Sequence, residues 1–345
     1  MNDANTTTLL DPHVATHAGE YAQAFARQCP FRHVVIDNFL AADVAAKLLV
    51  DFPPFERGNA RNEAGELGGK STVERIRQFG TPYAALDDLL QSRPFLDLVS
   101  HITGIPDLLY DPYYFGGGTH ENREGQDLDP HIDFNRHPIE NWHRRLNLIV
   151  YLNHEWSDAW GGSLELHSDP SSPDDRVHRV TPLFNRCVIF ETTEWSWHGF
   201  SRISLPPGRE QLTRKSIALY FYTRERPADE LADTHSTIYV DRPLPDRFRV
   251  GRTLSEADIE KLRVLIARPD QHNQRLCRDI TDLTGKLETT RTALHGGWPG
   301  RLRYFAAPAR AAAQADSAVN AGAGSKPRVD HPGSCSRRRP LRTGR

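Results

Sequence analysis

A histidine and an aspartate two positions apart, His131 and Asp133, are the residues of this sequence best suited to metal chemistry. In an extended backbone alternate side chains point to the same face, so an imidazole nitrogen and a carboxylate oxygen at this spacing can hold one metal ion. The pattern is short and recurs by chance. Its interpretation as a metal site therefore depends on a third ligand elsewhere in the chain.

His198, within the segment Trp195–Gly199, is the best candidate for that third ligand. Two histidines and one carboxylate on one face of an octahedron leave the opposite positions open, which suits a non-haem Fe(II) ion that activates O₂. Such an ion also needs a source of electrons. A 2-oxo acid can supply them while it chelates two open positions through its carboxylate and ketone oxygens.

The far carboxylate of a 2-oxo acid needs a cation inside an otherwise apolar interior, and a bidentate arginine is the strongest partner of this kind. Arg214 lies in the largely apolar segment 213–222, which is typical of a strand. On a strand Arg214 and Ser216 share a face, and Lys215 points the other way. We therefore expect Arg214 and Ser216 to hold the carboxylate, with Lys215 as the alternative cation.

The elements that must position these residues differ between two parts of the chain. Residues 1–106 show helical periodicity with one short strand, which predicts a helical buttress beside a sheet. Residues 107–226 instead contain short apolar strands separated by Gly, Pro and Asp turns. Because no helices alternate with these strands, we predict a sandwich or barrel rather than a parallel α/β sheet. The expected strands are 108–115, 146–152, 163–167, 177–182, 186–191, 195–201 and 216–223.

The last third of the chain has a different composition. Residues 227–305 begin with an irregular linker. Apolar residues then recur from Ile259 to Ile266, break at Pro269, and resume at heptad steps from Leu276 to Leu294. This seam is short, so a helix laid on the barrel and a coiled-coil homodimer are equally compatible with it. Residues 306–345 are basic and rich in Ala, Gly, Ser and Pro, which predicts a disordered tail.

Bulk composition narrows the class of protein. The chain has 345 residues and a formal net charge of −2, which gives no indication of a nucleic-acid partner. Its four cysteines lie far apart, which argues against a disulfide framework or zinc ribbon and favours reduced thiols in the cytoplasm. The N-terminus has no secretory pattern, and no apolar run approaches the roughly 20 residues that a membrane span needs.

Six ordered motifs between about Asp107 and Arg226 resemble those of the prolyl 4-hydroxylase-type Fe(II)/2-oxoglutarate oxygenases. The similarity is to the branch that contains prolyl hydroxylases of ribosomal protein and of the hypoxia pathway. In chain order the motifs are His131-x-Asp133, Val150–Asn153, Trp156 with Gly161–Leu164, Arg186–Phe190, His198 and Arg214-x-Ser216.

This resemblance implies a mainly β fold with flanking helices. The core at 107–226 is expected to be a double-stranded β-helix (jelly-roll), with the N-terminal buttress at 1–106 and a C-terminal helical extension at 227–305. It also implies that His131, Asp133 and His198 are the ligands of Fe(II). Arg214 becomes the partner of the distal carboxylate of 2-oxoglutarate.

Two tyrosines also match positions in the family. Tyr151 corresponds to a tyrosine that hydrogen-bonds the co-substrate. Tyr114 matches a second pocket tyrosine more loosely, because an insertion at Thr119–Leu128 separates it from the metal motif. We expect both side chains to contribute to binding of 2-oxoglutarate.

The activity that the resemblance implies is hydroxylation of a substrate C–H bond, with consumption of O₂ and 2-oxoglutarate and release of succinate and CO₂. Asp133 favours hydroxylation, because a small residue there would open a halide site. L-Ascorbate commonly supports the iron in this family. A prolyl residue, another protein side chain, a sugar and a small metabolite are all candidate substrates. The alternatives are a cupin-like metalloenzyme that does not use 2-oxoglutarate and a binding or scaffold protein with an inert barrel.

Overall fold

The structure, a computed structural model, describes residues 9–58, 71–240, 248–256, 258–259, 262–263 and 291. The chain divides into two compact units, Met1–Pro243 and Leu244–Arg345. All the helices and strands named below belong to the first unit. Its elements explain how residues from distant parts of the sequence come together.

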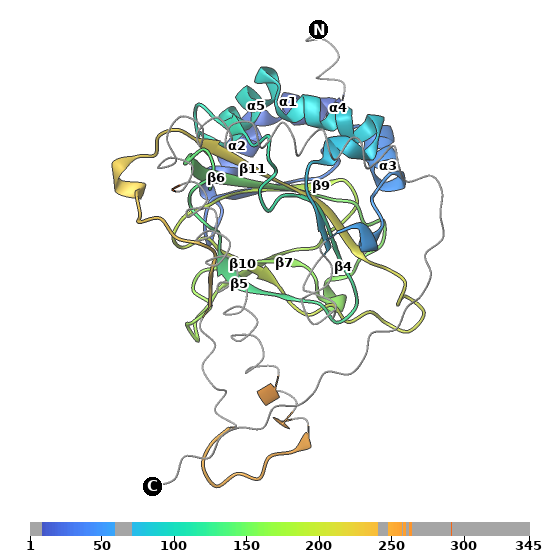
Figure 1. Ribbon diagram of the computed structural model, residues 1–345, viewed down its shortest axis with the longest axis vertical. Helices are drawn as coiled ribbons and strands as arrows, with labels where there is room; N and C mark the ends of the chain where they lie inside the picture. The colour runs from blue at the N-terminus through green and yellow to red at the C-terminus, as the bar shows by residue number, and fades with distance from the viewer. Residues whose placement is uncertain are drawn as a thin grey trace. The chain divides into compact units, whose positions relative to one another are not determined.

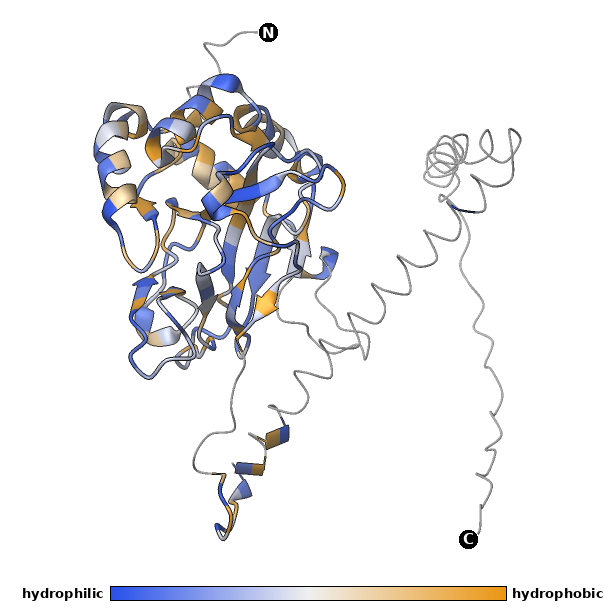
Figure 2. Cartoon of the chain, turned by 90° about the vertical axis from the view of Figure 1, so that its left-hand side faces the viewer, coloured by the Kyte–Doolittle hydropathy of each residue, from blue (hydrophilic) through white to orange (hydrophobic). Residues whose placement is uncertain are grey.

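The five described α-helices form one layer of this unit. In chain order the helices are α1 (Pro12–Thr16), α2 (Ala18–Arg27), α3 (Ala42–Val50), α4 (Thr81–Leu90) and α5 (Arg93–Thr103), with 3₁₀ helices η3 (Phe55–Arg57), η4 (Ile76–Phe79), η5 (Asp158–Trp160) and η6 (Ala228–Glu230). The helices carry both hydrophobic and hydrophilic residues (Figure 2). In α5 the Oγ of Ser92 accepts a hydrogen bond from the Phe95 amide at the N-terminus, and Gly104 ends the helix with φ +70°.

The strands form two antiparallel sheets. The larger sheet has the order β1 (His33–Ile36), β9 (Arg186–Glu191), β6 (His143–Tyr151), β11 (Arg214–Thr223), β4 (Gly118–Asn122) and β2 (Ser71–Val73), and β3 (Leu109–Tyr110) also pairs with β11. The smaller sheet has the order β12 (Ile238–Tyr239), β5 (Leu128–Ile132), β10 (Trp197–Phe200), β7 (Leu164–His167) and β8 (Val177–Val180).

The chain passes back and forth between the two sheets. From β4 onward, β4, β6, β9 and β11 lie in the larger sheet, while β5, β7, β8 and β10 lie in the smaller one. This winding produces the double-stranded β-helix that the sequence predicted. The two sheets face each other below the helical layer (Figure 1).

The helices cover the outer face of the larger sheet (Figure 1). Apolar side chains from the helices, such as Phe25, Leu48 and Val99, share one buried cluster with Leu146 and Leu219 from the sheet. Burial of these side chains stabilises the packing of helices on sheet. The other face of the sheet is therefore left to line the space between the two sheets.

Several predicted elements need correction. The strand predicted at 108–115 is only β3, because a turn follows and Tyr114 adopts φ +54°. The segment interpreted as an insertion, Thr119–Leu128, contains most of β4 and the start of β5. Its polar sequence resembles a loop, but β4 is buried between β11 and β2. The strand β12, beyond the predicted boundary at residue 226, pairs with β5 next to the metal motif.

Other predictions fall on parts of the chain outside the described residues. These are most of the apolar seam between Ile259 and Leu294 and the basic tail at 306–345. Within the described part of the chain, no helix combines the length and the apolar character needed to cross a membrane.

Asn185 joins the N-terminal segment to the sheet. Its side-chain Oδ1 accepts a hydrogen bond from the Leu40 amide at 2.9 Å, and its Nδ2 donates to the Leu40 carbonyl at 2.7 Å. The residue is buried and adopts φ +59°, a conformation that asparagine tolerates better than most residues. These two hydrogen bonds hold the start of α3 next to β9.

Asn185→Ala is expected to lower the free energy of unfolding by about 2–4 kcal/mol, because two buried backbone groups lose their partners. Chemical denaturation of the full chain measures this change. Asn141→Ala is the matched control, since Asn141 has φ +57° but is exposed. That variant is expected to lose only about 1 kcal/mol. Equal losses in the two variants would show that the buried hydrogen bonds contribute little.

Candidate active site

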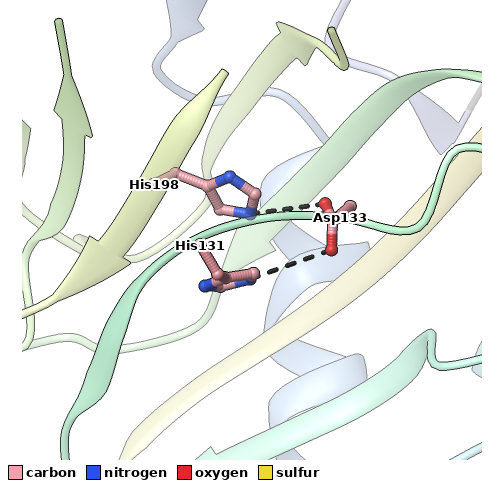
Figure 3. A group of neighbouring side chains, drawn as sticks. All are labelled: His131, Asp133 and His198. Atoms are coloured by element: carbon pink, nitrogen blue, oxygen red, sulfur yellow. Dashed lines mark ion pairs between the residues drawn. The ribbon is translucent and has the colours of Figure 1, made fainter. Parts of the chain in front are cut away.

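The pairing of β5 with β10 places two histidines side by side. His131 and His198 are direct partners in this antiparallel pair, so their side chains point to the same face. Their ring centroids lie 4.3 Å apart. Asp133 follows β5 and points toward both rings (Figure 3). Among the described residues, these three form the one group whose ligand atoms all lie within 4.8 Å of one another.

Hydrogen bonds fix the tautomer of both rings. The Nδ1 of His131 lies 2.9 Å from the carbonyl oxygen of Asp129, and the Nδ1 of His198 lies 2.9 Å from that of Ser196. A carbonyl oxygen can only accept, so each Nδ1 carries the proton and each Nε2 offers a lone pair. The two Nε2 atoms lie 3.8 Å and 3.4 Å from oxygens of Asp133. Lone pairs facing a carboxylate at these distances fit a bound cation.

Gly199 permits the close approach of the two strands. A Cβ at this position would lie 2.5 Å from the carbonyl oxygen of Leu128, closer than real Cβ atoms come to backbone. Any side chain would therefore push β5 away from β10 beside His198. The glycine after the histidine is a requirement of the site.

The charge states of the ligands also suit a cation. Burial lowers the pKa of His198, and the attraction of Asp133 offsets this only in part, so the imidazole is neutral near pH 7. For Asp133 burial alone would raise the pKa, but Arg144 and the two histidines outweigh it. The pKa of Asp133 therefore lies well below its usual range, and the carboxylate stays ionised.

Arg214 is a buried cation with no carboxylate partner among the described residues. Its Nε donates to the carbonyl of Gly162 at 2.6 Å and its Nη2 to the hydroxyl of Tyr151 at 3.2 Å. Burial lowers the pKa of its guanidinium, and of the groups around it only Tyr151 opposes this. A buried charge without a counter-ion is unfavourable unless an anion completes the site.

The surroundings of Arg214 connect it to the metal ligands. Its guanidinium lies 4.4 Å from the ring centroid of Phe200, two residues after His198, and 5.0 Å from that of Tyr151. Phe190 lies between the sheets, with its ring centroid 4.8 Å from that of His198. Arg214 and the three ligands thus line the same space between the two sheets.

Tyr151 and Ser216 lie opposite each other on β6 and β11, so both face the same side as Arg214. Both are buried. Because an arginine only donates, the Tyr151 hydroxyl accepts from Arg214 and its own hydrogen is available to an incoming carboxylate. The structure therefore brings Arg214, Tyr151 and Ser216 together, and their binding of 2-oxoglutarate stays a prediction.

Two other candidate residues lie elsewhere. Lys215 points to the opposite face of β11, where its Nζ lies 2.9 Å from the carboxylate of Glu121. The prediction for Tyr114 is corrected: its hydroxyl donates to the carboxylate of Asp87 at 2.7 Å, within the cluster under the helices. The turn at Tyr114 directs its ring toward the helices, so it lies apart from the metal ligands.

Sequence reasoning missed two residues of the site, Arg144 and Asn147. Both lie on β6, and both donate hydrogen bonds to Asp133. Their polar side chains in an otherwise apolar strand were the feature of the sequence from which they could have been predicted.

Comparison with known proteins agrees with this geometry. Residues 117–222 match the profile of the 2OG-Fe(II) oxygenase superfamily. The chain is 36% identical over 88 residues to prolyl 3-hydroxylase OGFOD1 of Xenopus laevis, which covers 24% of this chain and 16% of that protein. It is 31% identical over 111 residues to prolyl 3-hydroxylase OGFOD1 of Mus musculus, which covers 28% of this chain and 20% of that protein. The chain therefore spans a fifth or less of the length of these curated relatives.

A similar solved structure is a prolyl hydroxylase from Trichoplax adhaerens in complex with a peptide fragment of the hypoxia inducible factor oxygen degradation domain. The TM-score is 0.43 at 14% identity, over 61% of this chain and 90% of that one. Residues 117–222 are therefore similar to the 2OG-Fe(II) oxygenase superfamily. Their sequence resembles prolyl hydroxylases, as the motifs predicted.

Arg214→Met tests the assignment of the anion partner. We expect the affinity for 2-oxoglutarate to fall by roughly 100-fold or more, because loss of one partner of a buried charge pair costs about 2–5 kcal/mol. The free energy of unfolding without ligand should change by less than about 1 kcal/mol, since removal of an unpaired charge offsets the lost hydrogen bonds. Anaerobic calorimetry and chemical denaturation measure the two quantities. Lys215→Met is the control and should retain the affinity of the wild-type chain for 2-oxoglutarate. Loss of affinity in Lys215→Met with wild-type affinity in Arg214→Met would contradict the assignment.

Tyr151→Phe removes one hydroxyl from the same site. We expect roughly 10-fold weaker binding of 2-oxoglutarate in the same titration, because a hydrogen bond to a charged group contributes about 1.5 kcal/mol or more. Tyr83→Phe is the matched control, since the buried hydroxyl of Tyr83 donates to the Leu48 carbonyl in the helical layer. That variant should lose stability without losing affinity. Unchanged affinity in Tyr151→Phe would remove Tyr151 from the binding site.

Proposed function

We propose that this chain is an Fe(II)- and 2-oxoglutarate-dependent dioxygenase that hydroxylates a substrate C–H bond. The observation that carries the proposal is the combination of two features between the two sheets. Three residues offer a facial set of metal ligands, and Arg214 offers a buried positive charge that no carboxylate of the described chain neutralises. An ion and a dianionic 2-oxo acid complete both features at once.

The protein's own residues would hold and orient the reactants. His131 and His198 keep their protons on Nδ1 and present Nε2, while Asp133 stays ionised. When bound, Fe(II) and 2-oxoglutarate supply the activation of O₂, in which one oxygen atom enters succinate, the other enters the substrate, and CO₂ is released. The chain contributes fixed positions and a dry environment.

Arg214 and Tyr151 would determine the orientation of the co-substrate. Arg214 donates to the distal carboxylate, and the Tyr151 hydroxyl donates to the same group. Phe190 and Phe200 line the wall between these residues and His198, and both are buried. Apolar walls exclude water, which strengthens the interaction of the carboxylate with the guanidinium.

For the substrate, we propose a prolyl residue of a peptide or protein. The support is the identity of 36% over 88 residues with a protein named prolyl 3-hydroxylase. A panel of proline-containing peptides and cell metabolites tests this choice through succinate release. The use of L-ascorbate, a cytoplasmic location and a homodimer through the C-terminal helix stay predictions.

Asp133→Ala is the direct test of the function. The wild-type chain should bind Fe(II) and release succinate from 2-oxoglutarate with a substrate of the panel, and the variant should do neither, because the only anionic ligand is gone. Asp175→Ala is the matched control: Asp175 also pairs with a histidine of the smaller sheet, His167, at 2.6 Å, but it is not a ligand. This control should keep both properties. Retention of iron binding and succinate release in Asp133→Ala would refute the proposal.

The same assays separate the alternative functions. Turnover that needs no 2-oxoglutarate and is unaffected by Arg214→Ala would favour a cupin-like metalloenzyme. A wild-type chain that takes up neither iron nor 2-oxoglutarate would favour a binding or scaffold protein.

A further inference from the structure

One oxygen of the metal-binding carboxylate is engaged with the protein. The Oδ2 of Asp133 accepts a hydrogen bond from Arg144 Nη2 at 3.0 Å and another from Asn147 Nδ2 at 2.7 Å. Both donors come from β6 in the larger sheet. The carboxylate is therefore held from the opposite side of the space between the sheets.

Arg144 is itself held rigidly. Its Nε and Nη2 donate to the Oδ1 of Asn147 at 3.1 Å and 2.7 Å, which also fixes the amide orientation of Asn147. Its guanidinium lies near two rings, 4.4 Å from the centroid of Phe134 and 3.6 Å from that of Tyr220. Arg144 is one of the largest fully buried side chains of the protein. These ring contacts and hydrogen bonds leave the guanidinium little freedom to rotate.

A register shift in the sheet makes this arrangement possible. Asn147 pairs with Tyr220, Leu146 with Phe221, and Arg144 with Tyr222, so Arg145 is an extra residue in β6. Residues three apart on a regular strand point to opposite faces, but the extra residue brings Arg144 to the same face as Asn147. Arg145 instead contacts Glu230 at 3.1 Å. The bulge thus directs one arginine to the metal ligands and its neighbour away from them.

The two hydrogen bonds restrict how Asp133 can bind a metal. The Oδ2, which accepts both hydrogen bonds, lies 3.4 Å from the Nε2 of His198, and the Oδ1 lies 3.8 Å from the Nε2 of His131. The two donors on Oδ2 therefore fix the direction in which the carboxylate faces the two imidazoles.

We infer that Arg144 and Asn147 are positioning residues that hold the carboxylate of Asp133 in its orientation toward the Nε2 atoms of His131 and His198. This inference rests on the proposed function. Neither residue touches the reacting atoms; both act through Asp133. Their effect is on the affinity and geometry with which the three ligands hold a metal ion.

Two variants that keep the charge of the site test the inference. Asn147→Leu removes one donor, and Arg144→Lys retains a positive charge but not the planar fork. We expect each to weaken Fe(II) binding in anaerobic calorimetry by roughly 10- to 100-fold, as loss of such outer contacts does in other metal sites. We also expect the visible charge-transfer band of the Fe(II)–2-oxoglutarate complex to shift or lose intensity. Arg145→Lys is the matched control and should leave both readouts unchanged.

The outcomes separate a positioning role from a purely structural one. Variants that lose stability without metal, yet bind Fe(II) with wild-type affinity and give the wild-type band, would overturn the inference and leave a structural role. If Arg144→Lys does not fold, Asn147→Leu alone decides. A wild-type chain that forms no Fe(II)–2-oxoglutarate complex would instead overturn the proposed function. The two failures are distinguishable, because the first appears only in the variants and the second appears in the wild-type chain.

Discussion

The register between β5 and β10 is the constraint on which the rest of the site depends. His131 and His198 lie directly opposite each other in this pair. A slip by one residue would turn one ring to the other face of the sheet. Gly199 allows the close approach, and backbone carbonyls at Asp129 and Ser196 then fix both rings. Strand pairing thus brings together the three side chains that could hold a metal ion.

The larger sheet supplies the charges that complete this arrangement, through two buried arginines in different states. Arg144 is paired with Asp133, which balances its charge and orients the carboxylate. Arg214 is surrounded by Tyr151, Phe200 and the Gly162 carbonyl, none of which carries a negative charge. The charges in the space between the two sheets therefore balance near Asp133, whereas the region around Arg214 has a net positive charge. In the proposed function, this division would determine where a dianionic co-substrate lies and which of its ends meets the metal.

Prediction from the sequence succeeded for those residue juxtapositions that follow from simple alternation. The spacing of His131 and Asp133, and the shared face of Arg214 and Ser216, require only an extended backbone. It missed β4, because the polar residues there are buried by strands on both sides, which local sequence does not reveal. The positive φ of Tyr114 turned its ring toward Asp87. Arg144 could not be assigned, because the extra residue in β6 breaks the alternation on which such predictions rest.

Anomalous diffraction at the iron edge, from crystals grown without O₂ in the presence of Fe(II) and 2-oxoglutarate, tests the central claim most directly. The account predicts one iron peak in contact with Nε2 of His131, Nε2 of His198 and the carboxylate of Asp133. It also predicts that the 2-oxo acid chelates the iron and reaches Arg214 with its far carboxylate. An iron peak elsewhere in the chain, or a 2-oxo acid that does not meet Arg214, would contradict it.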